Sequence, residues 1–188
     1  MPKKIFLQII SILTGGIIFV TLCLNKGIFK NYFPHQIRLD FHFLFLSIIF
    51  SVILISFINL AVKYDKFIIP GILTKLSQLK YLILELTTTE KIYISLLAGF
   101  SEELLFRGFL QPLLGIIITS VLFGAAHFIT LGYFLLATGI GFFLGGVFHY
   151  SGNILVPIMV HTLYNIFAFS LLTKIFLKEE KAPNNKII

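Results

Sequence analysis

Residues 108–173 read GFLQPLLGIIITSVLFGAAHFITLGYFLLATGIGFFLGGVFHYSGNILVPIMVHTLYNIFAFSLLT and contain no Asp, Glu, Lys or Arg. A helix needs about 20 residues, at 1.5 Å per residue, to cross a hydrocarbon core about 30 Å thick. This stretch is therefore long enough for about three crossings. Turn-forming residues divide it at Pro112, at Leu131-Gly132 and at Ser151-Gly152-Asn153. We predict spans at Leu113–Leu131, Tyr133–Tyr150 and Ile154–Thr173.

The whole chain shares this apolar character. Of its 188 residues, 57% are hydrophobic and 12% are charged, whereas about 25% are charged in typical soluble domains. A soluble domain of this size leaves roughly a third of its unfolded-chain surface in water, so it could not bury this much apolar surface. We therefore expect the chain to be surrounded by the lipid of a bilayer. The net charge of +7 lies in short flanks between apolar runs, which favours anionic lipid over nucleic acid as a partner. The single Cys23 excludes a disulfide framework and a cysteine-based zinc site.

The N-terminal half adds further apolar runs. Ile5–Leu24 and Phe41–Val62 are free of charge, and Ile92–Gln111 is long enough to span although it is charged near its middle. Residues 66–91 carry several Lys and Glu and are broken by Pro70, which indicates an interfacial amphipathic segment. We therefore predict an all-α, polytopic transmembrane helix bundle of about six spans. Its single membrane domain, 1–188, divides into N-terminal spans and interfacial segment (5–91), core (92–173) and polar tail (174–188).

The distribution of basic residues predicts the topology. One set of flanks holds Lys3, Lys4, Lys63, Lys66, Lys75, Lys80, Lys91, Lys174, Lys178, Lys181 and Lys186. The opposite flanks hold only Lys26, Lys30 and Arg38. The positive-inside rule then places both termini in the cytoplasm. The small size and the bias towards Ile, Lys, Phe and Asn favour a bacterial source. Together with the predicted spans, they indicate a multi-pass protein of a bacterial plasma membrane.

Three charges lie where a span should be apolar: Glu102, Glu103 and Arg107. Each costs about 2.5–3.5 kcal/mol at a helix centre, so the chain must stabilise or use them. Helical spacing puts Glu103 and Arg107 at i and i+4, where they can pair. Glu102 points about 100° away and is left as a candidate general base. A buried polar lock between helices and an ion path remain alternatives.

Two later spans contribute polar groups. His127 follows the run Phe123-Gly124-Ala125-Ala126, and His161 lies one helical turn before Asn165. A single histidine in a span can simply bond a neighbouring helix, whereas an imidazole and an amide on one face can donate to an oxyanion. Helix rise places Glu102, His127 and His161 at similar depths. Their convergence favours hydrolysis by an activated water over ion passage.

Other hydrolytic sites lack their residues. The only aspartates, Asp40 and Asp65, flank the predicted spans, which excludes a buried two-aspartate site or a Ser-His-Asp triad. Neither His127 nor His161 begins a His-Glu-x-x-His zinc motif. Gly141-x-x-x-Gly145 lies inside a span and indicates tight helix packing rather than a phosphate loop.

These residues occur in three ordered motifs. The stretch from Glu102 to Arg107 resembles the Glu-Glu-x-x-x-Arg motif of the CPBP family, the CAAX-processing and bacteriocin-processing intramembrane proteases, also called Abi. Phe123 to His127 is similar to the second motif of that family, Phe-x-x-x-His, and His161 to Asn165 to the third, His-x-x-x-Asn. The resemblance covers about residues 92–172, and the first two spans match no motif.

The resemblance implies hydrolysis of a peptide bond of a membrane-associated peptide or protein. It implies water activation by Glu102 and His127, oxyanion stabilisation by His161 and Asn165, and support by Glu103, Arg107 and Phe123. No cofactor is expected, because no carboxylate in the spans is evident as a partner for either imidazole. The alternative is zinc held by Glu102, His127 and His161. Two other functions remain open: a non-catalytic protein giving immunity to a peptide toxin, and a proton-coupled transporter.

Overall fold

The protein was examined as a computed structural model, which describes residues 2–28, 37–64 and 68–181. All elements in these ranges are helical, as the composition predicts. Lys30, Lys66 and Lys186 of the topology prediction lie outside them. The elements are α1 (Lys3–Ile28), α2 (Phe41–Tyr64), α3 (Ile68–Leu76), η2 (Ser77–Leu79), α4 (Lys80–Glu85), α5 (Thr88–Glu103), η3 (Leu104–Leu110), α6 (Gln111–Ala126), α7 (Leu131–Ser151) and α8 (Leu155–Lys181).

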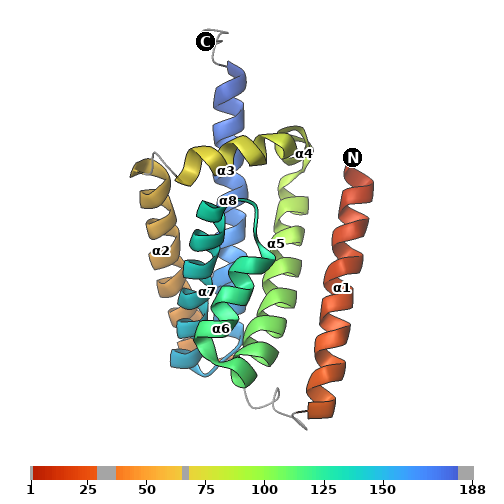
Figure 1. Cartoon of the computed structure of the whole chain (residues 1–188), viewed down its shortest axis with the longest axis vertical. Helices are drawn as coiled ribbons and strands as arrows, with labels where there is room; N and C mark the ends of the chain where they lie inside the picture. The colour runs from red at the N-terminus through yellow and green to blue at the C-terminus, as the bar shows by residue number, and fades with distance from the viewer. Residues whose placement is uncertain (1, 29–36, 65–67, 182–188) are drawn as a thin grey trace.

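The long helices lie roughly parallel to one another and alternate in direction (Figure 1). α1, α5 and α7 run away from the end at which both chain ends lie, and α2, α6 and α8 run back towards it. α3 and α4 cross that same end of the bundle. This crossing layer, with η2 between its two helices, occupies most of the predicted interfacial segment. The two ends of the chain therefore lie on one side, as the lysine distribution predicts.

Five helical segments in the described ranges are long and apolar enough to cross a membrane, against about six predicted spans. The difference arises because Thr88–Ala126 forms one continuous segment that includes α5, η3 and α6. Within it Gly115 has φ 77° and ψ 170°, a conformation that only glycine adopts without strain. The chain reverses its direction between η3 and the rest of α6 (Figure 1), and Gln111 and Ile116 both lie beside Gly145, so the reversal is close to the turn predicted at Pro112.

Two other predicted boundaries were misplaced. α6 ends at Ala126, and the non-helical connection to α7 covers 127–130, whereas the sequence predicts a break at Leu131-Gly132. α8 continues as a helix to Lys181, eight residues into the predicted polar tail. There Glu179 and Glu180 lie 3.9 and 3.8 Å from the Lys80 ammonium group of α4. The helical start of the tail therefore contacts the crossing layer.

Close backbone contacts at glycines position the helices that carry the polar groups. A Cβ added at Gly99 of α5 would meet the Thr162 hydroxyl and lie 3.1 Å from the Thr162 backbone nitrogen on α8. A Cβ added at Gly141 of α7 would lie 3.1 Å from the Ser120 carbonyl oxygen on α6. Small residues of this kind let membrane helices approach closely. The predicted packing role of Gly141 is confirmed.

The turn before α8 is held by residues far away in the sequence. The Asn153 side-chain amide donates to the Arg38 carbonyl oxygen at 2.6 Å, and its oxygen accepts from the backbone nitrogens of Arg38 and Leu155 at 3.3 and 3.2 Å. The Arg38 guanidinium group donates to the Ser151 carbonyl oxygen at 3.1 Å. This Arg38–Asn153 clamp joins the segment before α2 to the beginning of α8.

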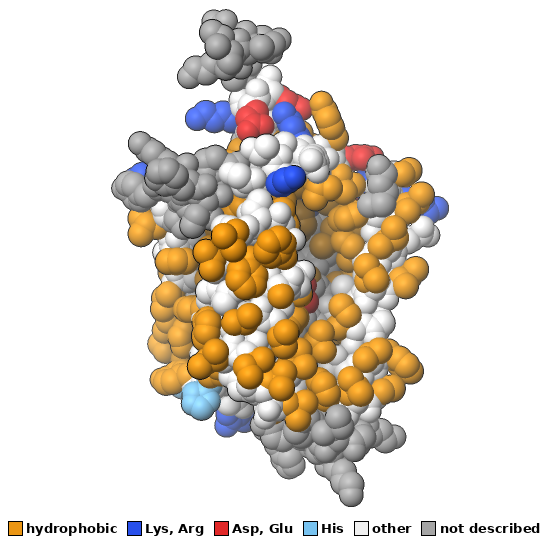
Figure 2. Space-filling model, viewed as in Figure 1, with side chains coloured by type: hydrophobic (Ala, Val, Ile, Leu, Met, Phe, Trp, Pro, Cys, Tyr) orange, Lys and Arg blue, Asp and Glu red, His pale blue; other side chains and the backbone are white. Residues whose placement is uncertain are grey.

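The outer surface is largely apolar, as Figure 2 shows for one face, which agrees with helices surrounded by lipid. α1 is the least enclosed helix. In its span 11% of residues are buried, compared with 39% in the span of α7. Its main neighbours are α5 and η3. α1 therefore packs along one edge of the bundle.

Candidate active site

The first motif lies where α5 changes into a π-helix. Glu102 and Glu103 are the last residues of α5, and Arg107 lies in η3, which is π-helical over its seven residues. π-helical turns are uncommon and are found frequently at functional sites. The two adjacent glutamates lie directly before this change of helix type and point about 100° apart.

Glu103 belongs to a fully enclosed group, which we call the sealed cluster: Glu103, Arg107 and His161. Arg107 Nη1 donates to Glu103 Oε1 at 3.0 Å, so the predicted i,i+4 pair forms, and both side chains are 0% exposed. Arg107 Nη2 donates to the Gly141 carbonyl oxygen of α7 at 2.9 Å. His161 Nδ1 donates to the same Glu103 oxygen at 2.7 Å. The sealed cluster thus ties α5, η3, α7 and α8 together.

Glu102 faces the other way and is partly exposed. Its Oε2 atom lies 3.4 Å from His127 Nε2 and 4.0 Å from His161 Nε2. The Glu102 and His127 side chains are 22% and 29% exposed. We call Glu102 and His127 the open pair. The structure therefore brings together the carboxylate and both imidazoles that the sequence placed on three separate spans.

The hydrogen bonds determine which ring nitrogens carry protons. His127 Nδ1 lies 2.8 Å from the Phe123 carbonyl oxygen, and a carbonyl can only accept. His161 Nδ1 likewise donates to the Glu103 carboxylate. In a neutral imidazole the other nitrogen is then an acceptor, so both Nε2 atoms present lone pairs. Glu102 Oε2 is also an acceptor and has no hydrogen-bond partner. Three acceptors therefore face one space, and the two O–H donors of a water molecule can satisfy two of them at a time.

Phe123 lies at the centre of these groups. Its ring stacks on His127 at 4.6 Å between centroids and meets His161 edge-on at 5.9 Å. The Arg107 guanidinium carbon lies 4.7 Å from the centroid of the same ring, within the range of a cation–π contact. With 3% of its surface exposed, Phe123 fixes the spacing between the sealed cluster and the open pair.

Asn165 lies one helical turn beyond His161 on α8 and is half-buried. Its amide forms no hydrogen bond within the ranges that the structure describes. Its role as a donor beside His161, which the i,i+4 spacing predicts, stays a prediction.

Sequence reasoning did not single out two tyrosines beside the site. The ring centroid of Tyr164 of α8 lies 6.3 Å from that of His161, and Tyr133 lies near the beginning of α7. The signal for Tyr164 was present, because it lies three residues after His161 on the same helix face. Tyr133 had no such signal, since it lies in a different span.

The structure also corrects the argument against a metal. Each imidazole does have a partner for its second nitrogen: the Glu103 carboxylate for His161 and the Phe123 carbonyl oxygen for His127. Metal-bound histidines commonly have such partners. However, no group of three or more His, Cys, Asp and Glu side chains in the described ranges is arranged to hold a metal ion. The partners of the two Nδ1 atoms therefore do not distinguish a zinc site from a site that uses water without a metal ion.

The fold and these groups define an integral, multi-pass membrane protein with a carboxylate and two imidazoles gathered inside its helix bundle. Residues 85–167 match the family model described as "Type II CAAX prenyl endopeptidase Rce1-like". This confirms the predicted resemblance, and at family level the match is to a CAAX-type intramembrane protease. The matched residues include all three motifs.

Among curated proteins, the uncharacterized protein YpbD of Bacillus subtilis is 41% identical over 73 residues. The alignment covers 37% of this chain and 39% of YpbD. The chain therefore matches about two fifths of the length of that relative. No solved structure matches the chain.

Proposed function

We propose that the protein is an intramembrane endopeptidase that hydrolyses a peptide bond of a membrane-associated peptide or protein in a bacterial plasma membrane. The observation that carries the proposal is the position of Glu102, whose Oε2 lies 3.4 and 4.0 Å from the Nε2 atoms of His127 and His161. The family match supports the reaction class, and the relative in Bacillus subtilis supports a bacterial setting.

In the proposed reaction, one water molecule lies between Glu102 and His127. Glu102 removes a proton from this water, and the remaining hydroxide attacks the scissile carbonyl carbon. A general base of this kind contributes about 10²–10⁴-fold to a rate. When the C–N bond breaks, the proton on Glu102 passes to the leaving amine, and the base is restored.

The developing oxyanion needs donors. Asn165 supplies an amide, and His161 donates through Nε2 in its doubly protonated form, for which the ring takes up the second proton from solvent before the attack and keeps it throughout the reaction. The Glu103 carboxylate at 2.7 Å from His161 Nδ1 then compensates the charge of the ring. Donors of this type act by being held in place before charge develops. The sealed cluster supplies that rigidity, because Arg107 holds Glu103 and thereby holds His161.

The proposal is tested by comparing the membrane-associated peptides of cells that carry the wild type, Glu102→Gln or Glu85→Gln. Glu85 is an exposed glutamate of α4, so Glu85→Gln makes the same chemical change away from the site. We expect uncleaved substrate to accumulate with Glu102→Gln alone. Identical peptides in all three strains would overturn the proposal. If toxin resistance nevertheless persists in the Glu102→Gln strain, a binding role in immunity is favoured.

We further propose that the reaction needs no metal ion. Incubating the purified protein with a zinc chelator separates the two mechanisms. Retained cleavage supports activation of water by Glu102 and His127. Loss of cleavage that added Zn²⁺ restores would instead assign a zinc ion to Glu102, His127 and His161.

A further inference from the structure

Two side chains tie the π-helical stretch η3 and the residue that follows it to α7. Arg107 Nη2 donates to the Gly141 carbonyl oxygen at 2.9 Å, and Gln111 Nε2 donates to the Gly145 carbonyl oxygen at 3.1 Å. The two donors are four residues apart, and so are the two acceptors, which places the hydrogen bonds on successive turns. Arg107 belongs to the sealed cluster, whereas Gln111 lies one turn beyond it.

The Gln111 side chain is enclosed and fits closely against α7. It is 8% exposed. A Cβ added at Gly145 would lie 2.9 Å from Gln111 Oε1 and 3.3 Å from the Ile116 side chain, so the glycine lets the amide reach the backbone of α7. A buried amide that lost this acceptor would have no water to replace it. The enclosure therefore holds the Gln111 amide at the Gly145 carbonyl group.

The backbone of Gln111 forms the last π-helical hydrogen bond. Its N–H group donates to the Phe106 carbonyl oxygen, five residues earlier, which is the π-helical pattern. π-helical turns are rare, which indicates that contacts with other elements keep the chain in this form. The side chain of Gln111 supplies such a contact at the residue where the pattern ends.

The residues of η3 support both parts of the site. Phe106 and Arg107 contact the Phe123 ring, at 5.0 Å between ring centroids and at 4.7 Å from the guanidinium carbon to the centroid. Phe123 in turn stacks on His127. Arg107 also binds Glu103 of the sealed cluster. A shift of η3 against α7 would therefore reach the sealed cluster and the open pair.

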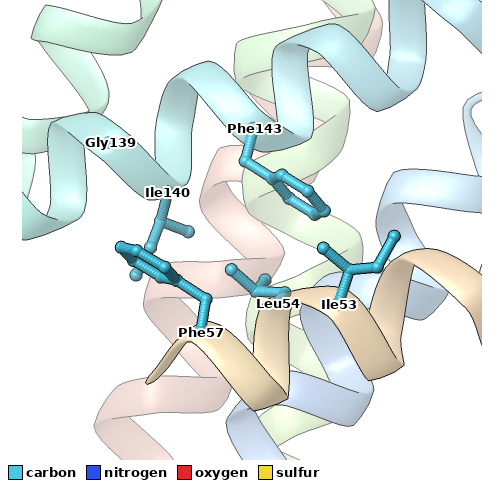
Figure 3. A pocket seen from close by; sticks show the side chains of 6 residues that line it. All are labelled: Ile53, Leu54, Phe57, Gly139, Ile140 and Phe143. Carbon is cyan, nitrogen blue, oxygen red and sulfur yellow. The ribbon is translucent and has the colours of Figure 1, made fainter. Parts of the chain in front are cut away.

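The contact between α7 and α2 is of a different kind. An apolar pocket of about 240 Å³ lies between these two helices (Figure 3). Its lining contains no polar side chain and consists of Ile53, Leu54, Phe57, Gly139, Ile140 and Phe143. Hydrophobic contact is non-directional, so this side of α7 does not specify a register. The directional contacts of α7 are those with Arg107 and Gln111.

We propose that Gln111 is a positioning residue for the reaction, because its amide holds η3 in π-helical form against α7 and so keeps Glu102 within reach of His127. The inference rests on the proposed function. Gln111 acts through η3 and not by contact with the reacting atoms. Loss of its amide releases the end of η3, shifts Phe106 and Arg107 on the Phe123 ring and slows the chemical step, while the groups that bind the substrate stay in place.

Three variants separate positioning from general stability. Gln111→Met keeps the length of the side chain and removes its amide. Gln8→Met makes the same chemical change at an exposed position of α1. Leu54→Ala removes a side chain that is 2% exposed and lines the pocket between α2 and α7, so it destabilises the bundle without touching η3. If Gln111→Met does not accumulate, Gln111→Asn replaces it, because its shorter side chain does not reach the Gly145 oxygen.

We expect Gln111→Met to lower kcat about 10–10²-fold, the scale on which a small misplacement of reacting groups acts. KM should stay unchanged, because no ground-state contact with the substrate is lost. Leu54→Ala should unfold at a lower temperature but keep the wild-type kcat, and Gln8→Met should match the wild type in both. The rates are measured on the substrate identified by the peptide comparison, with equal amounts of folded protein in phospholipid vesicles.

Hydrogen–deuterium exchange read by mass spectrometry follows η3 directly and needs no substrate. We expect the amides of residues 104–111 to exchange about three- to tenfold faster in Gln111→Met than in the wild type, the change in local opening that the loss of one hydrogen bond produces. The amides of α2 and the whole of Gln8→Met should exchange as in the wild type. Unchanged exchange of residues 104–111 in Gln111→Met would overturn the inference.

The failure of this inference differs from the failure of the proposed function. If the wild type and Glu102→Gln leave the same membrane peptides, the proposed function fails. If those peptides differ but Gln111→Met keeps the wild-type kcat, the function stands and the inference is overturned. An equal loss of kcat in Gln111→Met and Leu54→Ala would likewise overturn it, because general stability would then account for the effect.

Discussion

Glu102 and Glu103 are neighbours in the chain but differ in solvent exposure and in hydrogen bonding. The sealed cluster around Glu103 is closed to solvent, and its members bind one another and the Gly141 carbonyl oxygen, while Glu103 Oε2 and Arg107 Nε have no hydrogen-bond partner among the described residues. The open pair of Glu102 and His127 is partly exposed, and the Glu102 oxygen nearest the imidazoles has no hydrogen-bond partner. The comparison indicates that one glutamate holds the helices in place, while the next is partly exposed, as the proposed general base requires.

The largest expected effect concerns activity at the open pair. Glu102→Gln should lower cleavage about 10²–10⁴-fold, the contribution of a general base. The thermal unfolding temperature in detergent should stay near that of the wild type, because Glu102 carries no hydrogen bond that the change removes. A large drop in unfolding temperature would instead place Glu102 among the structural residues and remove the contrast between the two glutamates.

The next effect concerns stability at the sealed cluster. Arg107→Met leaves Glu103 buried without its partner, and breaking such a pair costs about 3–5 kcal/mol. Unfolding in detergent by denaturant measures this loss. Arg38→Met is the control, because its exposed guanidinium group makes one hydrogen bond to a carbonyl oxygen. If both variants lose the same stability, the sealed cluster has no special structural role.

A smaller effect is expected where α5 meets α8. Gly99→Ala should cost about 1–3 kcal/mol, the usual penalty for overpacking, because its Cβ would collide with the Thr162 hydroxyl. Separation of the helices should also lower activity by moving His161 away from Glu102. Gly146→Ala, in α7, has open space around the new methyl group and should be neutral or slightly stabilising. Similar behaviour of the two variants would contradict this account of the close contact.

The smallest effect is expected outside the bundle core. Lys80→Ala removes two ion pairs at 3.9 and 3.8 Å with partly exposed glutamates. Surface pairs of this kind contribute about 0–1 kcal/mol, so stability and cleavage should change little. A loss of several kcal/mol would show that the crossing layer of α3 and α4 is as important to the fold as the sealed cluster.

Composition and run lengths were sufficient to predict the helical membrane fold, because the cost of charge in lipid restricts where spans can lie. The turn near Pro112 was misplaced because proline and Gly115 both permit a reversal, and only the positive φ at Gly115 distinguishes them. The π-helical stretch from Leu104 to Leu110 could not be anticipated. Its hydrogen-bond pattern follows from packing against other helices rather than from local preference.

The Glu103–Arg107 pair was predictable because it is local, at i and i+4. The hydrogen bond from His161 to Glu103 joins residues 58 positions apart. The positions of these residues in the sequence do not indicate whether His161 binds Glu102 or Glu103. This hydrogen bond makes Glu103 the buried, bound glutamate and leaves Glu102 partly exposed. Long-range contacts of this kind also explain why the partner of His161 was missed when zinc was considered.

The early end of α6 has a consequence for the supply of water to the reaction. The connection at 127–130 leaves backbone groups outside any helix, and Phe128 and Ile129 are 63% and 41% exposed. Irregular backbone at membrane depth is tolerated only where protein or water surrounds it, so we expect water to reach this connection. Figure 1 shows this connection rising towards the end that holds both termini. Under the proposed function, and with the predicted cytosolic location of the lysine-rich end, each turnover draws its solvent molecule from that side of the membrane.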